Sequence, residues 1–231
     1  MTPDLLARLN EARRQKKPAA LIRRLRDNAQ SLVIDHHLVA GERLAEPVMV
    51  NLPELFRADR SEVREIEGED HFVQVFNPPL RLAIIGAVHI AQALAPMARV
   101  AGYDVTVIDP RGAFASDNRF PDTNLSRDWP DEAMDTFAPD ARAAVVTLTH
   151  DPKLDDPALD RALRSEAFYI TALGSKRTHG RRLERLKEMG HEPSSIARIH
   201  GPAGLAIGAI SPAEIAVAIM AQMTSVLRQG V

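Results

Sequence analysis

Four short polar segments of this 231-residue sequence each follow an apolar run that is typical of a buried strand. Their side chains include imidazoles, carboxylates, hydroxyls and cations, which are the groups that bind anions or transfer protons in protein sites. In a parallel sheet covered by helices, ligands bind beyond the carboxyl ends of the strands. We therefore expect one site at that edge, built from residues 86–89, 109–111, 149–151 and 174–177.

The first segment begins like a dinucleotide-binding motif, because an apolar strand runs into Gly86 and then into a helical pattern. The motif reads G-x-G-x-x-G, but its second glycine is replaced here by Val88 and its third by Ala91. A branched side chain at position 88 opposes close approach of a pyrophosphate, although a helix N-terminus still attracts anions. His89 either contacts a ligand or caps this turn.

Asp109 lies 23 residues after Gly86, at the end of the second predicted strand. An acidic residue at that spacing binds a ribose hydroxyl in dinucleotide-binding domains. Arg111 follows two residues later, so a salt bridge between the two side chains is the competing interpretation.

The turn after the fifth predicted strand favours an anion site more than the first turn does. Gly174 gives backbone freedom and Ser175 is a suitable helix N-cap. Lys176, Arg177 and His179 add positive charge or hydrogen-bond donors beside free backbone amides. The alternative is an ordinary capped helix with a solvated basic face.

Thr149, His150 and Asp151 form the remaining polar strand end, and His150 with Asp151 could serve as acid, base or ligand. Asp156-Pro157 is interpreted as the cap of the following helix, which is expected to begin at Pro157. A capping box is predicted over 211–214. The sequence contains neither a G-x-S-x-G elbow nor an H-E-x-x-H motif, which argues against those hydrolase and zinc chemistries.

A glycine-rich segment, residues 199–210, precedes the last predicted helix and contains His200 and Gly204. Its glycines permit close backbone approach to a ligand, but an ordinary connecting loop is an equal alternative. The last helix, predicted over 212–228, carries an apolar stripe that indicates core packing or, less favoured, a homodimer seam.

Strands that alternate with helices after residue 78 predict an α/β fold. We expect a doubly wound, mostly parallel Rossmann-like sheet in a domain spanning 78–231. Strands are predicted over 81–86, 103–110, 123–126, 143–150 and 167–174, and helices over 89–102, from 130, from 157, over 175–189 and over 212–228.

The consecutive prolines of Asn77-Pro78-Pro79 predict the domain boundary, since they interrupt both helices and strand pairing. Residues 1–77 are expected to form a small α+β amino-terminal region. In this region a helix is predicted over 3–27 and strands over 31–39 and 71–77, with no clear pattern between them. His36 and His37 would then point to opposite faces of one strand and are interpreted as structural.

Composition excludes several classes of protein. The formal net charge of −2 argues against a nucleic-acid binder that relies on a basic field. The sequence has no cysteine, which excludes disulfides and cysteine-ligated metals, and it has no apolar run of about 20 residues that would span a membrane. We expect a cytoplasmic protein.

Six segments, taken in order, resemble the Rossmann-type domain of the XdhC/CoxI family over about residues 78–228. They read GAVHIAQALAPMA, VTVIDPR, FASDNRFP, LTHDPKLDDPAL, FYITALGSKRTHGRRLERL and IHGPAGLAIGAISPAEIAVAI. The ordered set is specific, whereas no single segment is. Members of this family are maturation factors of molybdenum hydroxylases such as xanthine dehydrogenase and carbon monoxide dehydrogenase.

The resemblance implies a chaperone rather than a catalyst. Such a protein would bind the molybdenum cofactor, as molybdopterin or its nucleotide form, assist its sulfuration and deliver it to an apo molybdenum hydroxylase. The implied partners also include a cysteine desulfurase and a separate protein that carries the family's cysteine-containing amino-terminal domain. The cofactor-binding positions carried over are Gly86, His89, Asp109, Arg111, Thr149, His150, Asp151, Gly174, Ser175, Arg177, His179, His200 and Gly204.

The sequence departs from the family pattern in three places. The family commonly has G-A-G-H where this chain has Gly86-Ala87-Val88-His89, and an aspartate where it has Ala206. Residues 1–77 do not resemble the family's cysteine-containing domain. Two other functions therefore stay open: a Rossmann-type NAD(P)-dependent oxidoreductase, and a docking scaffold that holds no ligand.

Overall fold

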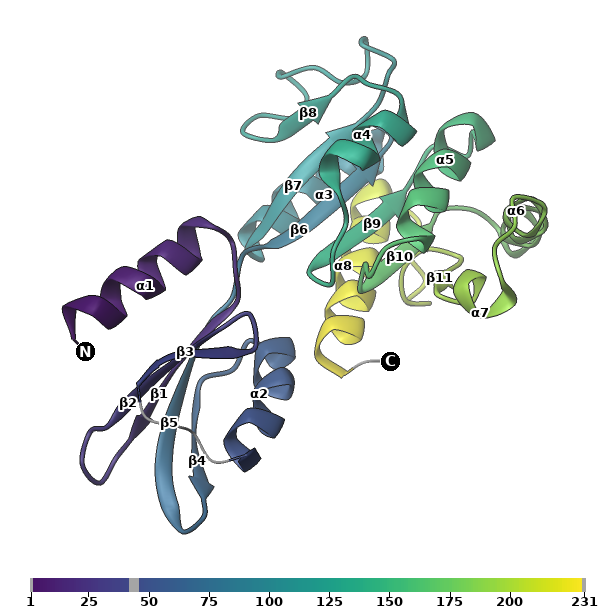
Figure 1. Cartoon of the computed structure of the whole chain (residues 1–231). Helices are drawn as coiled ribbons and strands as arrows, with labels where there is room; N and C mark the ends of the chain where they lie inside the picture. Colours follow the sequence, from purple (N-terminus) through teal and green to yellow (C-terminus); the bar gives the residue numbers. More distant parts are fainter. Residues whose placement is uncertain (1, 42–45, 230–231) are drawn as a thin grey trace. The chain divides into compact units, whose positions relative to one another are not determined.

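The computed structural model describes residues 2–41 and 46–229, and the chain divides into two compact units, residues 1–78 and 79–231 (Figure 1). Each unit has its own hydrophobic cores, since the core clusters at residues 5–76 and at residues 80–227 share no member. In the part of the chain that is described, no helix has the length and apolar character needed to cross a bilayer.

The amino-terminal unit is a five-stranded antiparallel sheet of order β3-β2-β1-β5-β4 with two helices. Alternating apolar residues of the strands pack against both helices in two small cores. The elements are α1 (Pro3–Arg14), β1 (Ala19–Arg24), β2 (Gln30–Ile34), β3 (His37–Gly41), α2 (Glu46–Ala58), β4 (Glu62–Ile66) and β5 (Glu69–Phe76).

The helix expected over 3–27 is wrong in its second half. The helix ends at Arg14, and after Pro18 the segment 19–24 is the central strand β1, hydrogen-bonded to β2 on one side and β5 on the other. Ala19, Ala20 and Ile22 are buried there. Pairing with two distant strands outweighs the weak helical periodicity of this stretch.

The single strand expected over 31–39 is also wrong, because it is a hairpin of β2 and β3. Asp35 and His36 form its turn with φ of 51° and 64°, the left-handed conformation that a type I′ hairpin turn requires at both positions. His36 packs edge-on against the ring of Phe56. The stretch without a predicted element contains α2 and β4, although residues 42–45 lie outside the described part.

The second unit is built on a six-stranded sheet whose neighbouring strands are all parallel. Near-continuous apolar runs form its central strands, as expected for strands buried on both faces. The elements are β6 (Leu80–Ile85), α3 (His89–Val100), β7 (Tyr103–Ile108), β8 (Asn124–Ser126), α4 (Pro130–Phe137), β9 (Ala143–Thr147), α5 (Pro152–Leu163), β10 (Tyr169–Ala172), α6 (Lys176–Glu188), α7 (Pro193–Ile196), β11 (Ile199–His200) and α8 (Pro212–Gln229).

In the strand order β11-β10-β9-β6-β7-β8, the chain adds strands in opposite directions on the two sides of the β6–β9 pair, which is itself parallel. From β6 the chain builds outward through β7 to β8, and then it crosses back to build β9, β10 and β11 on the other side. Such a switch opens a crevice at the carboxyl ends of the two central strands. The predicted doubly wound, Rossmann-like parallel sheet is confirmed.

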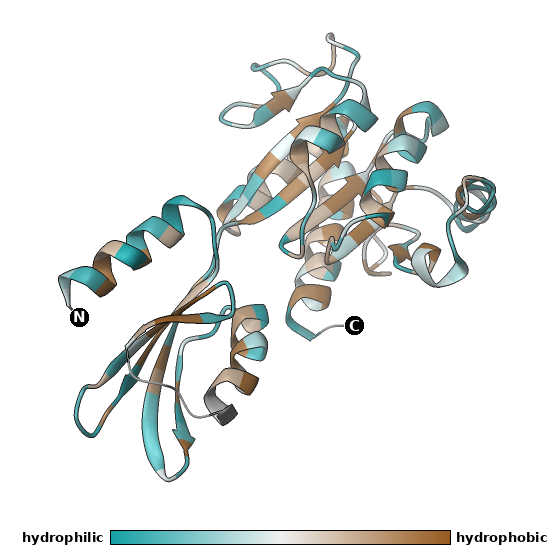
Figure 2. Cartoon of the chain, viewed as in Figure 1, coloured by the Kyte–Doolittle hydropathy of each residue, from teal (hydrophilic) through white to brown (hydrophobic). Residues whose placement is uncertain are grey.

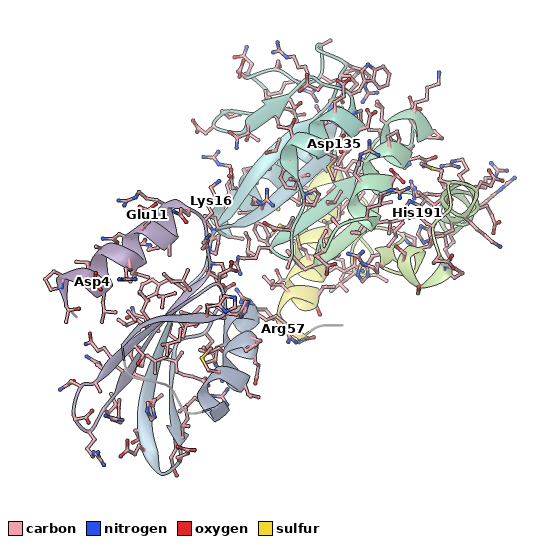
Figure 3. All side chains as sticks on the ribbon, viewed as in Figure 1. Asp4, Glu11, Lys16, Arg57, Asp135 and His191 are labelled. Atoms are coloured by element: carbon pink, nitrogen blue, oxygen red, sulfur yellow. The ribbon has the colours of Figure 1, made fainter. Side chains whose placement is uncertain are left out.

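Helices cover both faces of this sheet. α3 and α8 share one core with the sheet, and α4, α5 and α6 share the other (Figure 1). The apolar colouring of Figure 2 is concentrated in the central strands between these layers, while the outward surfaces of α5 and α6 are mostly hydrophilic. On one outward surface Asp135 of α4, labelled in Figure 3, accepts a hydrogen bond from Arg161 of α5.

The start of α5 differs from the expectation. The helix begins at Pro152, capped by Asp151, whose carboxylate accepts the Lys153 amide at 2.9 Å. Pro157 therefore lies inside the helix, and Asp156 pairs with Arg185 of α6 and caps nothing. The predicted caps of the other two helices are confirmed: Ser175 caps α6, and the capping box over 211–214 opens α8.

Candidate functional site

The turns after β6, β7, β9 and β10 lie at the carboxyl edge of the sheet, and contacts between them bring most of the predicted site residues together. A Cβ added to Gly86 would lie 2.5 Å from Cγ2 of Thr149, and one added to Gly174 would lie 3.9 Å from Nδ1 of His150. Asp109 of the β7 turn accepts a hydrogen bond from the Ala87 amide of the β6 turn at 2.8 Å. The four segments therefore form one continuous surface.

Gly86 makes the first turn possible. Its φ is +104°, and its missing side chain leaves room for Thr149 of the neighbouring turn. Val88 then holds the N-cap position of α3 with extended backbone and no side-chain cap. His89, the first helical residue, is exposed, and the first amides of α3 have no side-chain cap.

Asp109 holds two turns together. Its fully buried carboxylate accepts the Ala87 amide at 2.8 Å, the Arg111 amide at 3.0 Å and a bidentate pair from the Arg111 guanidinium at 2.8 and 2.9 Å. Burial alone would raise the pKa of Asp109, but these bonds outweigh it and hold that pKa below its ordinary value. Both oxygens are engaged within the protein, which supports the salt-bridge interpretation over ribose binding.

A buried polar chain links the β9 and β10 turns. The Thr149 hydroxyl donates to Asp155 at 2.7 Å, and Asp155 pairs with Arg182 of α6 at 3.4 Å. Arg182 also donates to the carbonyl of Leu173 at 2.9 Å, next to the Ser175 turn. Burial raises the pKa of Asp155 and lowers that of Arg182, although each partner opposes the shift of the other.

His150 stands between these bonded groups in an unusual conformation. Its φ is 63°, which a residue with a side chain adopts infrequently, and its imidazole is exposed. Thr149 and Asp151 on either side are fixed by hydrogen bonds, including the Asp151 amide on the Thr149 hydroxyl at 3.0 Å. The turn thus presents the His150 ring at the edge of the sheet from a constrained backbone.

The Ser175 turn has the features of an anion site. The Ser175 hydroxyl accepts the Thr178 amide at 3.2 Å, and the His179 amide bonds to the Ser175 carbonyl. The amides of Lys176 and Arg177 precede the first helical hydrogen bond and point along the positive end of the helix dipole. The side chains of both residues are exposed, so charge and amides are available at one place.

His179 contributes less charge to that turn than the sequence analysis expects. Its ring packs against Gly201, where an added Cβ would lie 2.2 Å from Nδ1. Burial, followed by the neighbouring Arg182, lowers the pKa of His179, so the ring is neutral near pH 7. The positive charge of the turn therefore comes from Lys176 and Arg177.

His200 and Gly204 make contacts of a structural kind. The His200 ring stacks on Tyr169 with centroids 5.1 Å apart, and burial lowers its pKa. Gly204 has a φ of +88° and lies against α8, where an added Cβ would meet Ala218 at 2.8 Å. Its amide donates to Gln222, which also accepts the Tyr169 hydroxyl. Stacking on Tyr169 thus accounts for the position of His200, and packing against α8 for that of Gly204.

Sequence analysis missed Asp155 and Arg182, the two charges at the centre of the buried chain. Arg182 is 1% exposed, and its Nε and Nη1 have no hydrogen-bond partner among residues 2–41 and 46–229. Arg182 lies in a run of basic residues, so its burial could not be recognised from the sequence. No group of three or more histidine, aspartate or glutamate side chains suited to a metal occurs in the same ranges.

The strand order and these turns define a doubly wound Rossmann-type domain with its polar groups at the topological switch. The sequence profile of the XdhC Rossmann domain matches residues 82–223, and the chain belongs to this family. The predicted resemblance is confirmed.

Curated relatives carry related names. The molybdenum cofactor insertion chaperone PaoD of Escherichia coli is 33% identical over 151 residues, which are 65% of this chain and 41% of PaoD. A protein of Bacillus subtilis named as a probable xanthine dehydrogenase subunit is 32% identical over 153 residues, 66% of this chain and 44% of that protein. The chain spans less than half the length of these relatives.

The similarity to a solved structure includes the amino-terminal unit. A crystal structure described as a xanthine dehydrogenase from Bacillus halodurans superposes with a TM-score of 0.76 at 25% identity. The superposition covers 98% of this chain and 67% of that one.

Proposed function

We propose that this protein binds the molybdenum cofactor and assists its insertion into a molybdenum hydroxylase of the xanthine dehydrogenase or carbon monoxide dehydrogenase type. The observation that carries the proposal is the Ser175 turn, where free amides and two exposed cations lie at the carboxyl edge of a Rossmann-type sheet. The names of the relatives, one a molybdenum cofactor insertion chaperone and one a part of a xanthine dehydrogenase, support the same role.

The residues present fit one end of this cofactor. Its phosphate, or the phosphates of its nucleotide form, would bind the amides of Lys176 and Arg177 with charge from both side chains. The rest of the cofactor would contact the other predicted residues along this edge. These are Gly86, His89, Arg111, Thr149, His150, Asp151 and Gly174. Asp109 would act by holding Arg111 and the first turn, and His179, His200 and Gly204 by supporting the surrounding backbone.

Sulfuration would need a partner. The chain contains no cysteine, so it offers no thiol on which to carry a sulfur atom. We propose that a cysteine desulfurase supplies the sulfur while this chain holds the cofactor, and that a separate protein supplies the family's cysteine-containing domain.

Deleting the gene tests the proposed function. The hydroxylase should then be made in normal amount but lack active, sulfurated cofactor, as measured by its activity and by pterin and molybdenum analysis of the purified enzyme. Full hydroxylase activity in the deletion strain would contradict the proposal.

A double variant tests the site. Lys176→Ala with Arg177→Ala should lower the pterin that copurifies with the protein from molybdenum-replete cells. Lys187→Ala, which removes an exposed cation from the other end of α6, is the matched control and should leave the pterin content unchanged. Equal pterin content in all three proteins would argue for a docking scaffold that does not use this turn.

A nicotinamide cofactor is the competing ligand, because the strand order is the one found in dinucleotide-binding domains. Val88 at the second glycine slot and the engaged carboxylate of Asp109 oppose it. Calorimetry with NAD, NADP and their reduced forms separates the two, and micromolar binding of any of them without copurifying pterin would favour the oxidoreductase.

A further inference from the structure

An exposed aromatic ring and a fixed guanidinium lie together just beyond the carboxyl end of β7. The Arg111 Cζ lies 4.7 Å from the centroid of the Phe114 ring, within the range of a stacked cation–π pair. Phe114 is 43% exposed and the Arg111 side chain 40%. An exposed phenyl ring beside a guanidinium offers a flat surface on which an aromatic ligand can stack.

Hydrogen bonds within the protein fix both Arg111 and the backbone of Phe114. Arg111 is fixed in plane by its bidentate bonds to Asp109, and the Phe114 amide closes a turn onto the Arg111 carbonyl at 2.8 Å. Arg119 donates to the Phe114 carbonyl at 2.8 Å and to Gln92 in the first turn of α3 at 3.0 Å. The Cζ of Arg119 also lies 5.8 Å from the centroid of the Phe114 ring, so this arginine connects the ring to α3.

The charge around Arg111 does not suit an anion. Asp109, Asp151 and Asp155 all act on its guanidinium and raise its pKa, following the direct bond to Asp109. The charge of Arg111 is thus balanced by the bonded carboxylate of Asp109, whereas Lys176 and Arg177 add exposed positive charge at the Ser175 turn. A neutral flat ring can still stack on a guanidinium plane and on a phenyl ring.

We propose that Arg111 and Phe114 form a stacking platform for a flat heteroaromatic ring, either a pterin or a purine. The inference rests on the proposed function and names the part of the ligand that binds at β7. Three strand spacings separate β7 from β10, roughly 14 Å, so the platform and the Ser175 turn would contact different parts of a ligand.

The test measures binding of two flat rings by the full-length protein. Free pterin is followed by quenching of its own fluorescence, guanosine 5′-monophosphate by calorimetry, and inorganic phosphate serves as the ring-free probe. Phe114→Leu keeps an apolar side chain and removes the aromatic face. The matched control is Phe137→Leu, because Arg81 stacks on Phe137 at 4.8 Å near the opposite, amino end of β6.

We expect Phe114→Leu to weaken binding of at least one ring about tenfold, with phosphate binding unchanged and Phe137→Leu equal to wild type. The ring that responds identifies the class, pterin or purine. Equal binding by wild type and Phe114→Leu, equal weakening by both variants, or no binding of either ring by wild type would each overturn the platform. None of these results bears on the copurifying pterin or the deletion strain, which test the proposed function separately.

Discussion

At the scale of single residues, the candidate site depends on glycines that no other residue could replace without strain. Gly86 and Gly204 both have positive φ, and each has a neighbour where its side chain would be. The neighbours differ: Gly86 meets the movable side chain of Thr149, whereas Gly204 meets α8, including its backbone. Position 204 is therefore the less tolerant of the two.

Gly204→Ala should destabilise the protein by about 2 kcal/mol or more, because the new Cβ has both an unfavourable φ and a clash with α8. The free energy of unfolding is measured by urea denaturation. Gly208→Ala is the control, since Gly208 also has a positive φ but nothing lies within 4 Å of an added Cβ. An equal loss of stability in both variants would show that the positive φ, and not the contact with α8, causes the destabilisation.

Two half-buried histidines should make stability depend on pH. Burial lowers the pKa of His179 and His200, so the unfolded chain binds their protons at a higher pH than the folded protein does. Their contribution to stability is present above about pH 6.5 and is lost as the pH falls through the lowered pKa values. Stability should therefore rise with pH in that window.

The measurement compares urea midpoints from pH 5 to pH 8. His179→Asn with His200→Asn should flatten the slope below pH 6.5, while the exposed His89→Asn should retain it. An unchanged slope in the double variant would mean that other groups cause the pH dependence.

At the scale of elements, the Asp155–Arg182 pair ties α5 to α6 beneath two turns of the site. Arg182→Met should destabilise the protein by about 3 kcal/mol, because it leaves Asp155 buried without its cation. Adding Asp155→Asn to this variant should recover part of the lost stability. Urea denaturation of the two single variants and the double variant gives the coupling, and strictly additive losses would show that the pair is not coupled.

The elements that sequence analysis predicted well are those decided by local pattern. The strands of the parallel sheet are buried on both faces, so their apolar runs identify them directly. The bounds of helix α6 lie within one residue of those predicted, because Gly174 and Ser175 are typical of the residues that precede a helix. The Ser175 turn, the candidate anion site, follows from the same signals.

The elements that were missed depend on partners far away in the chain. β1 owes its conformation to pairing with β2 and β5, which no local pattern reports. Asp151-Pro152 and Asp156-Pro157 fit a helix start equally well, but in the fold Asp151 caps α5 while Asp156 binds Arg185 of α6. Asp155 and Arg182 were missed for the same reason, since each is an ordinary surface charge until the fold buries it.

At the scale of the whole molecule, two sets of hydrophobic cores correspond to two units of the chain. The cores at residues 80–227 draw no residue from the amino-terminal unit. A fragment of residues 79–231 should therefore fold alone, with a cooperative thermal transition and the helical circular dichroism expected for its helices. A fragment that lacks a cooperative transition would show that the Rossmann-type unit needs the rest of the chain.

The turn that carries Phe114 also has a thermodynamic consequence. Ala115 and Phe120, which follow Phe114 in the chain, are buried, and Arg127 donates to the Ala115 carbonyl. Immobilising a side chain when a partner binds costs about 0.5–1.5 kcal/mol in conformational entropy. Here that entropy is lost when the chain folds, so a ring that docks on Phe114 would bind to a surface already in place.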